Sequence, residues 1–281
     1  ELEVQLQAQN AAGTTTQNYI GDFAKLSRWT NDPLTDEIAV AAVDQVTSAD
    51  LSPRLDVTGV ASFSWTNGLG VISSDLIVNR APAPDGSLLA AFGVAPVDDD
   101  GVGLLPASID MDVDGDSSND HARLTAPLDS EEFRFGRMQI NNAFGPETRE
   151  LPVAMLVEYF DVGSGWRIAS DDSCTQLVNS ELIVDGGGDL DASVGSGTST
   201  AVPSFVFPGG FSFSSGDAGL SFTAPGSGNV GQFDLGANLA NYPWLQFDWN
   251  GDGNYDNDPV GVITFGQYRG NDHIIYWREV H

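Results

Sequence analysis

Residues 110 to 120 form a candidate metal-binding loop. The stretch begins Asp-Met-Asp-Val-Asp-Gly, with carboxylates at alternate positions and Gly115 directly after the third of them. Oxygen side chains in this spacing converge on hard cations such as Ca²⁺, and the glycine permits the sharp turn that such a loop needs. Without a counter-ion, the neighbouring carboxylates would repel one another. We therefore predict a structural calcium site with the candidate ligands Asp110, Asp112, Asp114, Asp116 and Asp120.

Residues 248 to 259 form a second candidate loop that opens in the same way. Oxygen-bearing side chains again alternate with other residues, and Gly253 follows the third of them. The stretches before and after it have the composition of strands, so we expect a loop between two strands. The candidate calcium ligands of this second loop are Asp248, Asn250, Asp252, Asp256 and Asp258.

Neither loop is a complete EF-hand, because the twelfth position requires a bidentate Glu and holds His121 in one loop and Pro259 in the other. Each loop therefore has an alternative that needs no metal. Residues 110 to 120 could be a solvated acidic loop. Residues 248 to 259 could be an Asx-rich hairpin loop whose carboxylates accept hydrogen bonds from backbone amides. The sequence leaves both alternatives open.

Aromatic residues crowd around the second acidic loop, namely Trp244, Trp249 and Tyr255. Aromatic rings beside acidic side chains and calcium are typical of sugar-binding loops, and most such rings in other proteins simply belong to the core. The candidate glycan contacts are Trp249 and Tyr255.

The sequence contains no recognisable catalytic motif. It contains no Gly-x-Ser-x-Gly elbow, no phosphate-cradling Gly-x-x-x-x-Gly-Lys and no His-x-x-x-His pair. The only histidines are His121, His273 and His281, without the Cys/His spacing of a zinc site. We expect a protein that is not an enzyme, with no catalytic residues to name.

The charge of the chain excludes several classes of partner. Its 281 residues include 40 acids against 11 Lys and Arg, which gives a formal net charge of -29. Such a chain repels nucleic-acid phosphates and anionic lipid headgroups, so we expect no nucleic-acid partner. The longest apolar run, residues 88 to 97, is about half of the roughly 20 residues that span a bilayer, so we expect no direct membrane insertion. With only one cysteine, Cys174, the chain can form no internal disulfide. The acids beside it disfavour the thiolate, so we expect a buried structural residue or a thiol that pairs outside this stretch.

The elements that position these loops are predicted to be strands. Alternating apolar and polar residues recur along the chain with turn residues between them, which indicates an all-β fold. A proline and a run of charges near residues 125 to 132 indicate a module boundary. We therefore predict two tandem β-sandwich-like modules with long acidic loops, at residues 1–128 and 129–281.

Three segments have a sequence that departs from this strand pattern. Residues 36 to 46 begin with a candidate Asp cap and could be a helix, as could the short stretch 234 to 240. Residues 185 to 200 are rich in Gly, Asp and Ser and are predicted to be a mobile loop. By contrast, residues 151 to 160 are apolar on both faces apart from Glu158, which predicts a central strand.

Several sequence blocks resemble a known family. The first half contributes residues 18–26, 83–86 and 95–98. The second half contributes Phe-Arg-Phe-Gly-Arg-Met from residue 133, Asp-Asp-Ser-Cys-Thr from 171 and Tyr-Pro-Trp-Leu from 242. It ends with Thr-Phe-Gly-Gln-Tyr-Arg-Gly-Asn-Asp from 264 and Ile-Ile-Tyr-Trp-Arg-Glu from 274. Together they resemble the C-terminal region of the MshQ family of the mannose-sensitive haemagglutinin (MSHA) pilus system.

This resemblance implies a context more than a mechanism. It implies a protein exported from a Gram-negative bacterium and located at the cell surface or with a type IV pilus, and it supplies no catalytic residues. We expect a module that supports adhesion or pilus assembly with calcium-stabilised loops, and with pilus components or surface ligands as partners. The alternative is a calcium-dependent, lectin-like domain that binds glycans, and a hydrolase is the remaining hypothesis.

Overall fold

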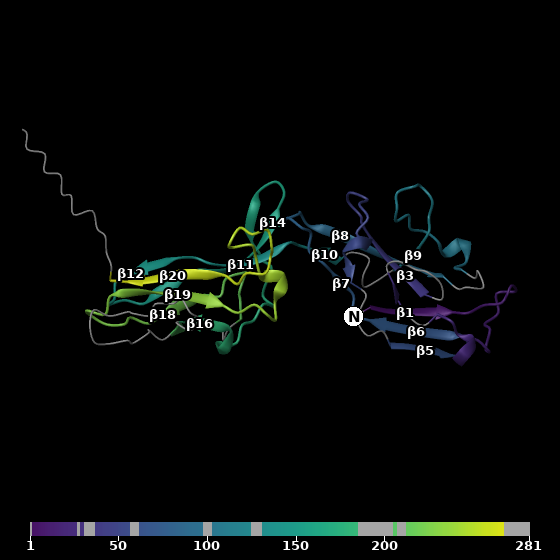
Figure 1. The fold of residues 1–281 in the computed structure, drawn as a ribbon, viewed down its shortest axis with the longest axis horizontal. Coiled ribbons are helices and arrows are strands. Elements are labelled where there is room, and N and C mark those ends of the chain that lie inside the picture. Colours follow the sequence, from purple (N-terminus) through teal and green to yellow (C-terminus); the bar gives the residue numbers. More distant parts are fainter. Residues whose placement is uncertain are drawn as a thin grey trace, which may run out of the picture. The chain divides into compact units, whose positions relative to one another are not determined.

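The computed structural model divides into two compact units, Glu1–Arg134 and Phe135–His281. It describes residues 2–26, 29–30, 37–56, 62–97, 103–124, 131–184, 205–206 and 212–266. Figure 1 colours unit 1 from purple to blue and unit 2 from teal to yellow. We expected a boundary after residue 128, whereas the division falls after Arg134, because the strand at residues 131–133 pairs within unit 1.

Unit 1 consists of short strands and 3-10 turns. Its turns are η1 (Gly21–Phe23), η2 (Ser52–Arg54) and η3 (Pro106–Ser108). Its strands are β1 (Leu2–Gln7), β2 (Trp29–Thr30), β3 (Glu37–Asp44), β4 (Leu55–Asp56), β5 (Ser62–Thr66), β6 (Leu69–Ser74), β7 (Ile77–Val78), β8 (Leu88–Val97), β9 (Ala122–Arg123) and β10 (Glu131–Phe133).

Two sheets of unit 1 pack face to face. One has the strand order β1-β6-β5, and the other has the order β10-β8-β3-β2 with β9 also paired to β8, while β4 and β7 form a separate ladder. Val4 and Ile72 from the first sheet share one buried cluster with Ile38, Val40 and Phe92 from the second. Apolar side chains from two facing sheets thus form a single core, which is the arrangement of a β-sandwich.

Unit 2 has the same kind of construction. Its turns are η4 (Asn179–Glu181) and η5 (Pro243–Leu245). Its strands are β11 (Gly136–Ile140), β12 (Ala143–Gly145), β13 (Leu151–Val153), β14 (Met155–Asp161), β15 (Gly165–Ile168), β16 (Leu182–Val184), β17 (Phe205–Val206), β18 (Leu220–Phe222), β19 (Gly231–Ala237) and β20 (Val260–Phe265).

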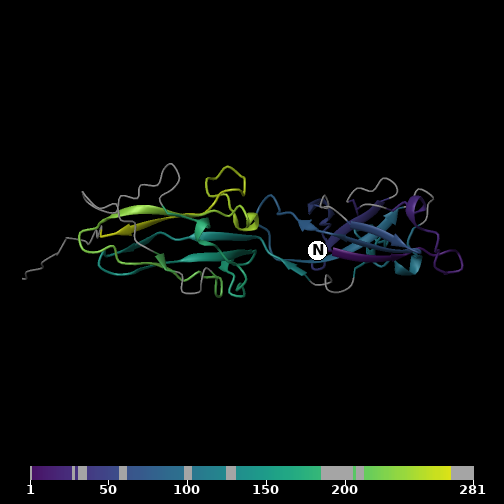
Figure 2. The same cartoon turned by 90° about the horizontal axis from the view of Figure 1, so that it is seen from below.

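The core of unit 2 lies between its sheets, whose strand orders are β11-β14-β15, β12-β20-β19-β16 and β13-β18-β17. Met138 and Met155 pack in one buried cluster with Phe222, Phe233 and Ile263. In Figure 2 the yellow-green strands β19 and β20 lie in one layer of unit 2 and teal strands lie in the other. The predicted central strand is broken at residue 154 into β13 and β14, and β14 is central, between β11 and β15.

The all-β prediction is confirmed, since the part of the chain that the structure describes contains strands and 3-10 turns. No helix among the described residues is long and apolar enough to cross a membrane.

Both predicted helices are wrong. Residues 37–44 form β3, whose side chains are all buried because apolar groups cover both of its faces. An apolar run without alternation fits a fully buried strand as well as a helix, and the β-branched Ile38, Val40 and Val43 favour the strand. Residues 231–237 form β19, in which Phe233, Leu235 and Ala237 are buried at every second position.

Of the two expectations for Cys174, the buried structural residue is wrong, because its thiol is exposed and free. Pairing of the thiol outside this stretch stays a prediction. The side chain of Asp172 accepts hydrogen bonds from the amides of Cys174 and Thr175, both at 3.0 Å, which holds the chain in a surface turn. The predicted mobile loop at residues 185–200 and the family blocks beyond residue 266 lie outside the described residues.

Asp44 is a buried acid that ends β3 and is only 1% exposed. Its carboxylate accepts hydrogen bonds from the hydroxyl and amide of Thr47 at 2.5 and 3.0 Å and from the amide of Leu89 at 3.0 Å. Burial by itself raises the pKa of this carboxyl, but these hydrogen bonds outweigh burial, so its pKa lies below the ordinary value of 3.8.

We predict that Asp44 makes unit 1 sensitive to acid. Because the folded-state pKa lies below the unfolded one, the stabilisation is complete above about pH 4 and is lost as the pH falls through the folded-state pKa. Asp44→Asn should lower the free energy of unfolding at pH 7 by about 1 to 3 kcal/mol and flatten its decline below pH 4. Urea unfolding between pH 2 and 7 measures both effects. An unchanged acid decline in Asp44→Asn would contradict the assignment.

Candidate metal centre

The first acidic loop is a hairpin closed by a backbone bridge between Met111 and His121. The amide of Met111 donates to the carbonyl of His121 at 3.0 Å, and the amide of His121 donates to the carbonyl of Met111 at 3.1 Å. Directly after the bridge, β9 pairs with β8. The loop therefore begins and ends at fixed points beside the larger sheet of unit 1.

Two apolar side chains attach this loop to the sheet. Met111 is 1% exposed and Val113 is 7% exposed, and both pack against Ala41 and Val43 of β3. Alternate side chains point to opposite faces of an extended chain. Burying Met111 and Val113 therefore directs Asp112, between them, and Asp114, after them, to the opposite side of the chain.

Gly93 of β8 makes room for this contact. A Cβ atom at residue 93 would lie 2.6 Å from the sulfur of Met111 and 3.0 Å from the Cβ of His121. Both distances are too short for ordinary packing. The loop can lie this close to β8 only because residue 93 has no side chain.

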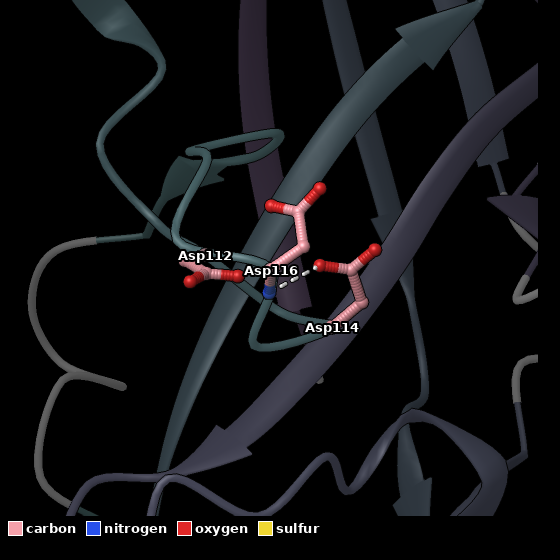
Figure 3. A group of neighbouring side chains, drawn as sticks. All are labelled: Asp112, Asp114 and Asp116. Carbon is pink, nitrogen blue, oxygen red and sulfur yellow. Dashed lines mark hydrogen bonds between the residues drawn. The ribbon is translucent and has the colours of Figure 1, made fainter.

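The carboxylates of Asp112, Asp114 and Asp116 come together on the exposed side of the loop (Figure 3). One oxygen of each lies within 4.8 Å of the others. Oxygen ligands lie about 2.3 to 2.6 Å from a bound Ca²⁺, so two of them on the same ion are separated by up to about 5 Å. The three carboxylates thus fit the ligand spacing of one calcium ion.

Backbone amides hold these carboxylates in place. Asp112 accepts from the amides of Gly115 at 2.8 Å and Ser117 at 2.9 Å. Asp114 accepts from the amide of Asp116 at 3.1 Å, the bond drawn in Figure 3, and Asp116 accepts from Ser118 at 2.7 Å. Gly115 and Ser117 have positive φ angles of 77° and 71°, so the loop folds tightly around the Asp112 carboxylate.

The other two predicted ligands of this loop lie at its base. Asp110 accepts a hydrogen bond from the amide of Arg123 at 2.8 Å. Asp120 has an oxygen 2.8 Å from Nδ1 of His121, the distance of an ion pair when the imidazole is protonated. The group of three neighbouring carboxylates includes neither residue.

The second acidic loop is closed by a bridge between Phe247 and Asn257. Asp248 accepts from the amides of Asp252 at 2.9 Å and Gly253 at 3.1 Å. Asp252 accepts from the amide of Asn254 at 2.8 Å and from the side-chain amide of Asn250 at 3.0 Å. These two bonds lower the pKa of Asp252 from its ordinary value, so this carboxyl stays charged further into acid.

Asp256 and Asp258 make different contacts. Asp258 accepts from the amide of Leu239 at 3.1 Å and from the side chain of Gln246 at 3.0 Å, and Asp256 accepts from the side chain of Asn257 at 3.1 Å. The hydrogen bonds of this loop are those of an Asx-rich hairpin. Among the described residues, the groups of three or more acidic or histidine ligands comprise only the one at Asp112, Asp114 and Asp116.

An arginine stacked among aromatic rings attaches the second loop to the sheet of β11, β14 and β15. The Arg137 guanidinium lies 3.9 Å from the ring centroid of Trp166, 5.1 Å from that of Phe247 and 5.2 Å from that of Trp249. It also pairs with Glu158 at 2.7 Å, where both side chains are 13% exposed. Cation–π contacts and a shielded ion pair thus meet at one residue.

The two candidate glycan contacts differ in exposure. Trp249 is 39% exposed. Tyr255 is half-buried, and its ring centroid lies 5.2 Å from that of Phe135 and 5.4 Å from that of Phe247. Trp249 therefore presents ring surface to solvent, whereas Tyr255 packs within the aromatic cluster.

Sequence reasoning missed the residues that position both loops. The alternation of Met111 and Val113 with aspartates was a visible signal for a strand-like segment lying on a sheet. Gly93 and Arg137 gave no local signal, because their partners are distant in the chain.

Comparison with family models places both units in one family. The model described as "DUF6701, third domain" matches residues 1–123, and the one described as "DUF6701, fourth domain" matches residues 134–280. The chain belongs to the DUF6701 family. The fourth-domain match begins at residue 134, one residue before unit 2 begins at Phe135.

Other comparisons add little to this family assignment. No curated protein matched the chain. Among solved structures, the full ectodomain (Ig1–Ig3) of mouse nectin-like molecule 4 matches at 9% sequence identity and a TM-score of 0.24. The match covers 82% of this chain, which spans 56% of that ectodomain. At this level of similarity, the all-β assignment depends on the strand pairing described above.

We predict that Arg137 makes a large contribution to the stability of unit 2. Arg137→Ala removes the stack and leaves Glu158 shielded without its partner, so the free energy of unfolding should fall by about 2 to 4 kcal/mol. Arg137→Lys should recover only part of the loss, because an ammonium group cannot stack and pair in the same way.

The matched control is Arg167→Ala on β15, an exposed arginine that donates to Ser164. It should change stability by less than about 0.5 kcal/mol. Urea unfolding followed by tryptophan fluorescence measures all three variants. Equal losses for Arg137→Ala and Arg167→Ala would show that the stack has no special role.

Proposed function

We propose that this chain is a pair of non-enzymatic structural modules of an exported surface or pilus-associated protein, and that calcium stabilises its acidic loops. The observation that carries the metal part of the proposal is the group formed by Asp112, Asp114 and Asp116, whose carboxylate oxygens lie within 4.8 Å of one another. Oxygen donors at this spacing suit a hard divalent cation better than a soft one.

The attachment of the loop supports a structural role for the ion. Met111 and Val113 are buried against β3, so a cation held by the neighbouring Asp112, Asp114 and Asp116 would tie the loop to the sheet. The site is exposed at Asp114 and Asp116, which suits stabilisation more than chemistry on a bound substrate. Asp248, Asn250 and Asp252 of the second loop are proposed as a weaker site.

The cellular context of the proposal comes from the sequence blocks that resemble the MshQ family. Those blocks motivate a location at the cell surface or on a type IV pilus of a Gram-negative bacterium, and a role in adhesion or pilus assembly. The acidic composition is consistent with an exposed, well-solvated protein.

One observation favours glycan binding as a second function. Trp249 exposes 39% of its surface. The Phe247 ring, whose centroid lies 5.1 Å from that of Trp249, and the Arg137 guanidinium pack against it from within the unit. A rigid, partly exposed indole beside the polar Asn250 and Asp252 could stack on a sugar ring. Glycan-array binding that Trp249→Ala and chelation both abolish would favour this function over a purely structural one.

We predict that calcium raises the melting temperature of the protein through the first loop. A ligand at a hundredfold excess over its Kd stabilises the native state by about 2.7 kcal/mol, which for a unit of this size is on the order of 5 to 10 °C. Asp114→Asn should abolish most of the calcium shift. Asp252→Asn should reduce it only if the second loop also binds. Differential scanning calorimetry in millimolar calcium or in chelator, at constant ionic strength, measures the shift.

Two controls separate a site from general screening of the negative charge. Magnesium at the same concentration should give a smaller shift. Asp22→Asn removes one exposed charge from η1 and should leave the calcium shift unchanged. Equal melting-temperature shifts with calcium and magnesium would contradict the calcium sites. Full calcium shifts in both Asp114→Asn and Asp252→Asn would contradict them too, and both loops would then be solvated acidic turns.

We also predict that the protein is accessible from outside the cell. Antibodies raised against this chain should label intact cells of the source bacterium. The protein itself should co-purify with pili that are sheared from those cells. Labelling only after the cells are lysed would contradict the surface location, without affecting the calcium proposal.

A further inference from the structure

The sequence contains two Asn-Gly pairs, Asn67-Gly68 and Asn250-Gly251. In such a pair the amide nitrogen of the glycine can lose its proton to solvent and attack the side-chain carbonyl carbon of the asparagine, because no Cβ obstructs the approach. The attack closes a succinimide ring, and the Cγ–Nδ2 bond breaks as the side-chain nitrogen takes a proton from water and leaves as ammonia. Water then opens the ring to aspartate or isoaspartate. The surroundings of each pair decide whether it can react.

The first pair is locked in a tight hairpin. Asn67 and Gly68 connect β5 to β6 and have positive φ angles of 51° and 80°, the backbone of a two-residue turn of the Asn-Gly type. Gly68 is buried, and its carbonyl accepts a hydrogen bond from the amide of Ala8 at 2.8 Å. A Cβ at residue 68 would lie 2.3 Å from the carbonyl oxygen of Thr16. Ring closure must rotate this backbone and expose the glycine nitrogen to solvent, and the packing opposes both.

The second pair lies in an open part of the second acidic loop. Asn250 and Gly251 are both exposed. No described atom lies within 4 Å of the place that a Cβ at residue 251 would take. The bridge that closes the loop joins Phe247 to Asn257, several residues from the pair on each side. The backbone at Asn250 can therefore rotate without breaking the pairing of a strand.

Hydrogen bonds prepare the side chain of Asn250 for attack. Its Oδ1 accepts from the amide of Asp252 at 3.1 Å, and its Nδ2 donates to the Asp252 carboxylate at 3.0 Å. The side chain is thus folded back along the residues that follow it. An amide that donates to Oδ1 also stabilises the negative charge that develops on this oxygen when the carbonyl carbon is attacked. The loop therefore exposes the attacking nitrogen and polarises the carbonyl that it attacks.

We propose that Asn250 is a site of spontaneous deamidation and that the fold protects Asn67 from the same reaction. The reaction consumes one water, releases one ammonia and adds one negative charge, and it needs no other reactant. The new carboxylate has no N–H to donate to Asp252, so repulsion replaces the bond between the two side chains. The change occurs directly beside the exposed Trp249 and loosens the loop that carries it.

Peptide mapping by mass spectrometry tests this proposal on the full chain, incubated in mildly alkaline buffer. Conversion of Asn250 to aspartate and isoaspartate should be at least tenfold faster than conversion of Asn67 in the same sample. In concentrated urea the two asparagines should react at rates within about threefold of each other, because the fold no longer separates them. Equal rates in the folded protein, or the same rate ratio in urea as in buffer, would overturn the proposal.

Two variants test the role of the attacking nitrogen. Gly251→Ala places a methyl group beside it and should slow the conversion of Asn250 at least tenfold. The matched control is Gly253→Ala in the same loop, where φ is 86° against 76° at Gly251, so it imposes similar backbone strain without altering that nitrogen. It should leave the conversion of Asn250 within about threefold of the unchanged protein. Equal slowing by both variants would overturn the proposal.

Discussion

Hydrogen bonds from backbone amides to aspartate carboxylates hold the turns of this protein. The chain carries 30 Asp among its 40 acids, and in an all-β chain most of them must sit in loops. Asp44, Asp112, Asp172, Asp248 and Asp252 each accept bonds from nearby main-chain amides. Such bonds fix the orientation of each carboxylate, so the same contacts that fold the turns hold their negative charge in place.

Each acidic loop becomes a defined feature only because it is attached to a sheet. The first loop is held by Met111 and Val113, which cover the second face of β3, and by the absence of a side chain at Gly93. The second loop is held by Phe247 and Trp249 around the Arg137 guanidinium. Carboxylates on anchored loops lose less conformational freedom when they bind a cation, and this links the fold to the proposed function.

The sequence predicts the fold class well because alternation is a local property of a half-buried strand. The alternation of apolar and polar residues is absent at β3. The first loop covers the face of β3 that would otherwise be polar, so both faces of the strand are apolar. The spacing of Asp112, Asp114 and Asp116 predicted their convergence. Asp110 and Asp258 also accept hydrogen bonds that the sequence did not indicate, from the amides of Arg123 and Leu239, which lie 13 and 19 residues away. Contacts of that range depend on strand register, which local patterns do not specify.

The central claim is that backbone amides organise the first acidic loop and that the cation then binds a preformed group of carboxylates. Amide hydrogen exchange at Gly115 and Ser117 in the presence of chelator tests this most directly, because both amides donate to Asp112. We expect both to exchange at least tenfold more slowly than unstructured amides without any metal, and calcium to add to that protection. Exchange at the unstructured rate in chelator, with protection only after calcium is added, would contradict the claim and make the loop a segment that the metal itself folds.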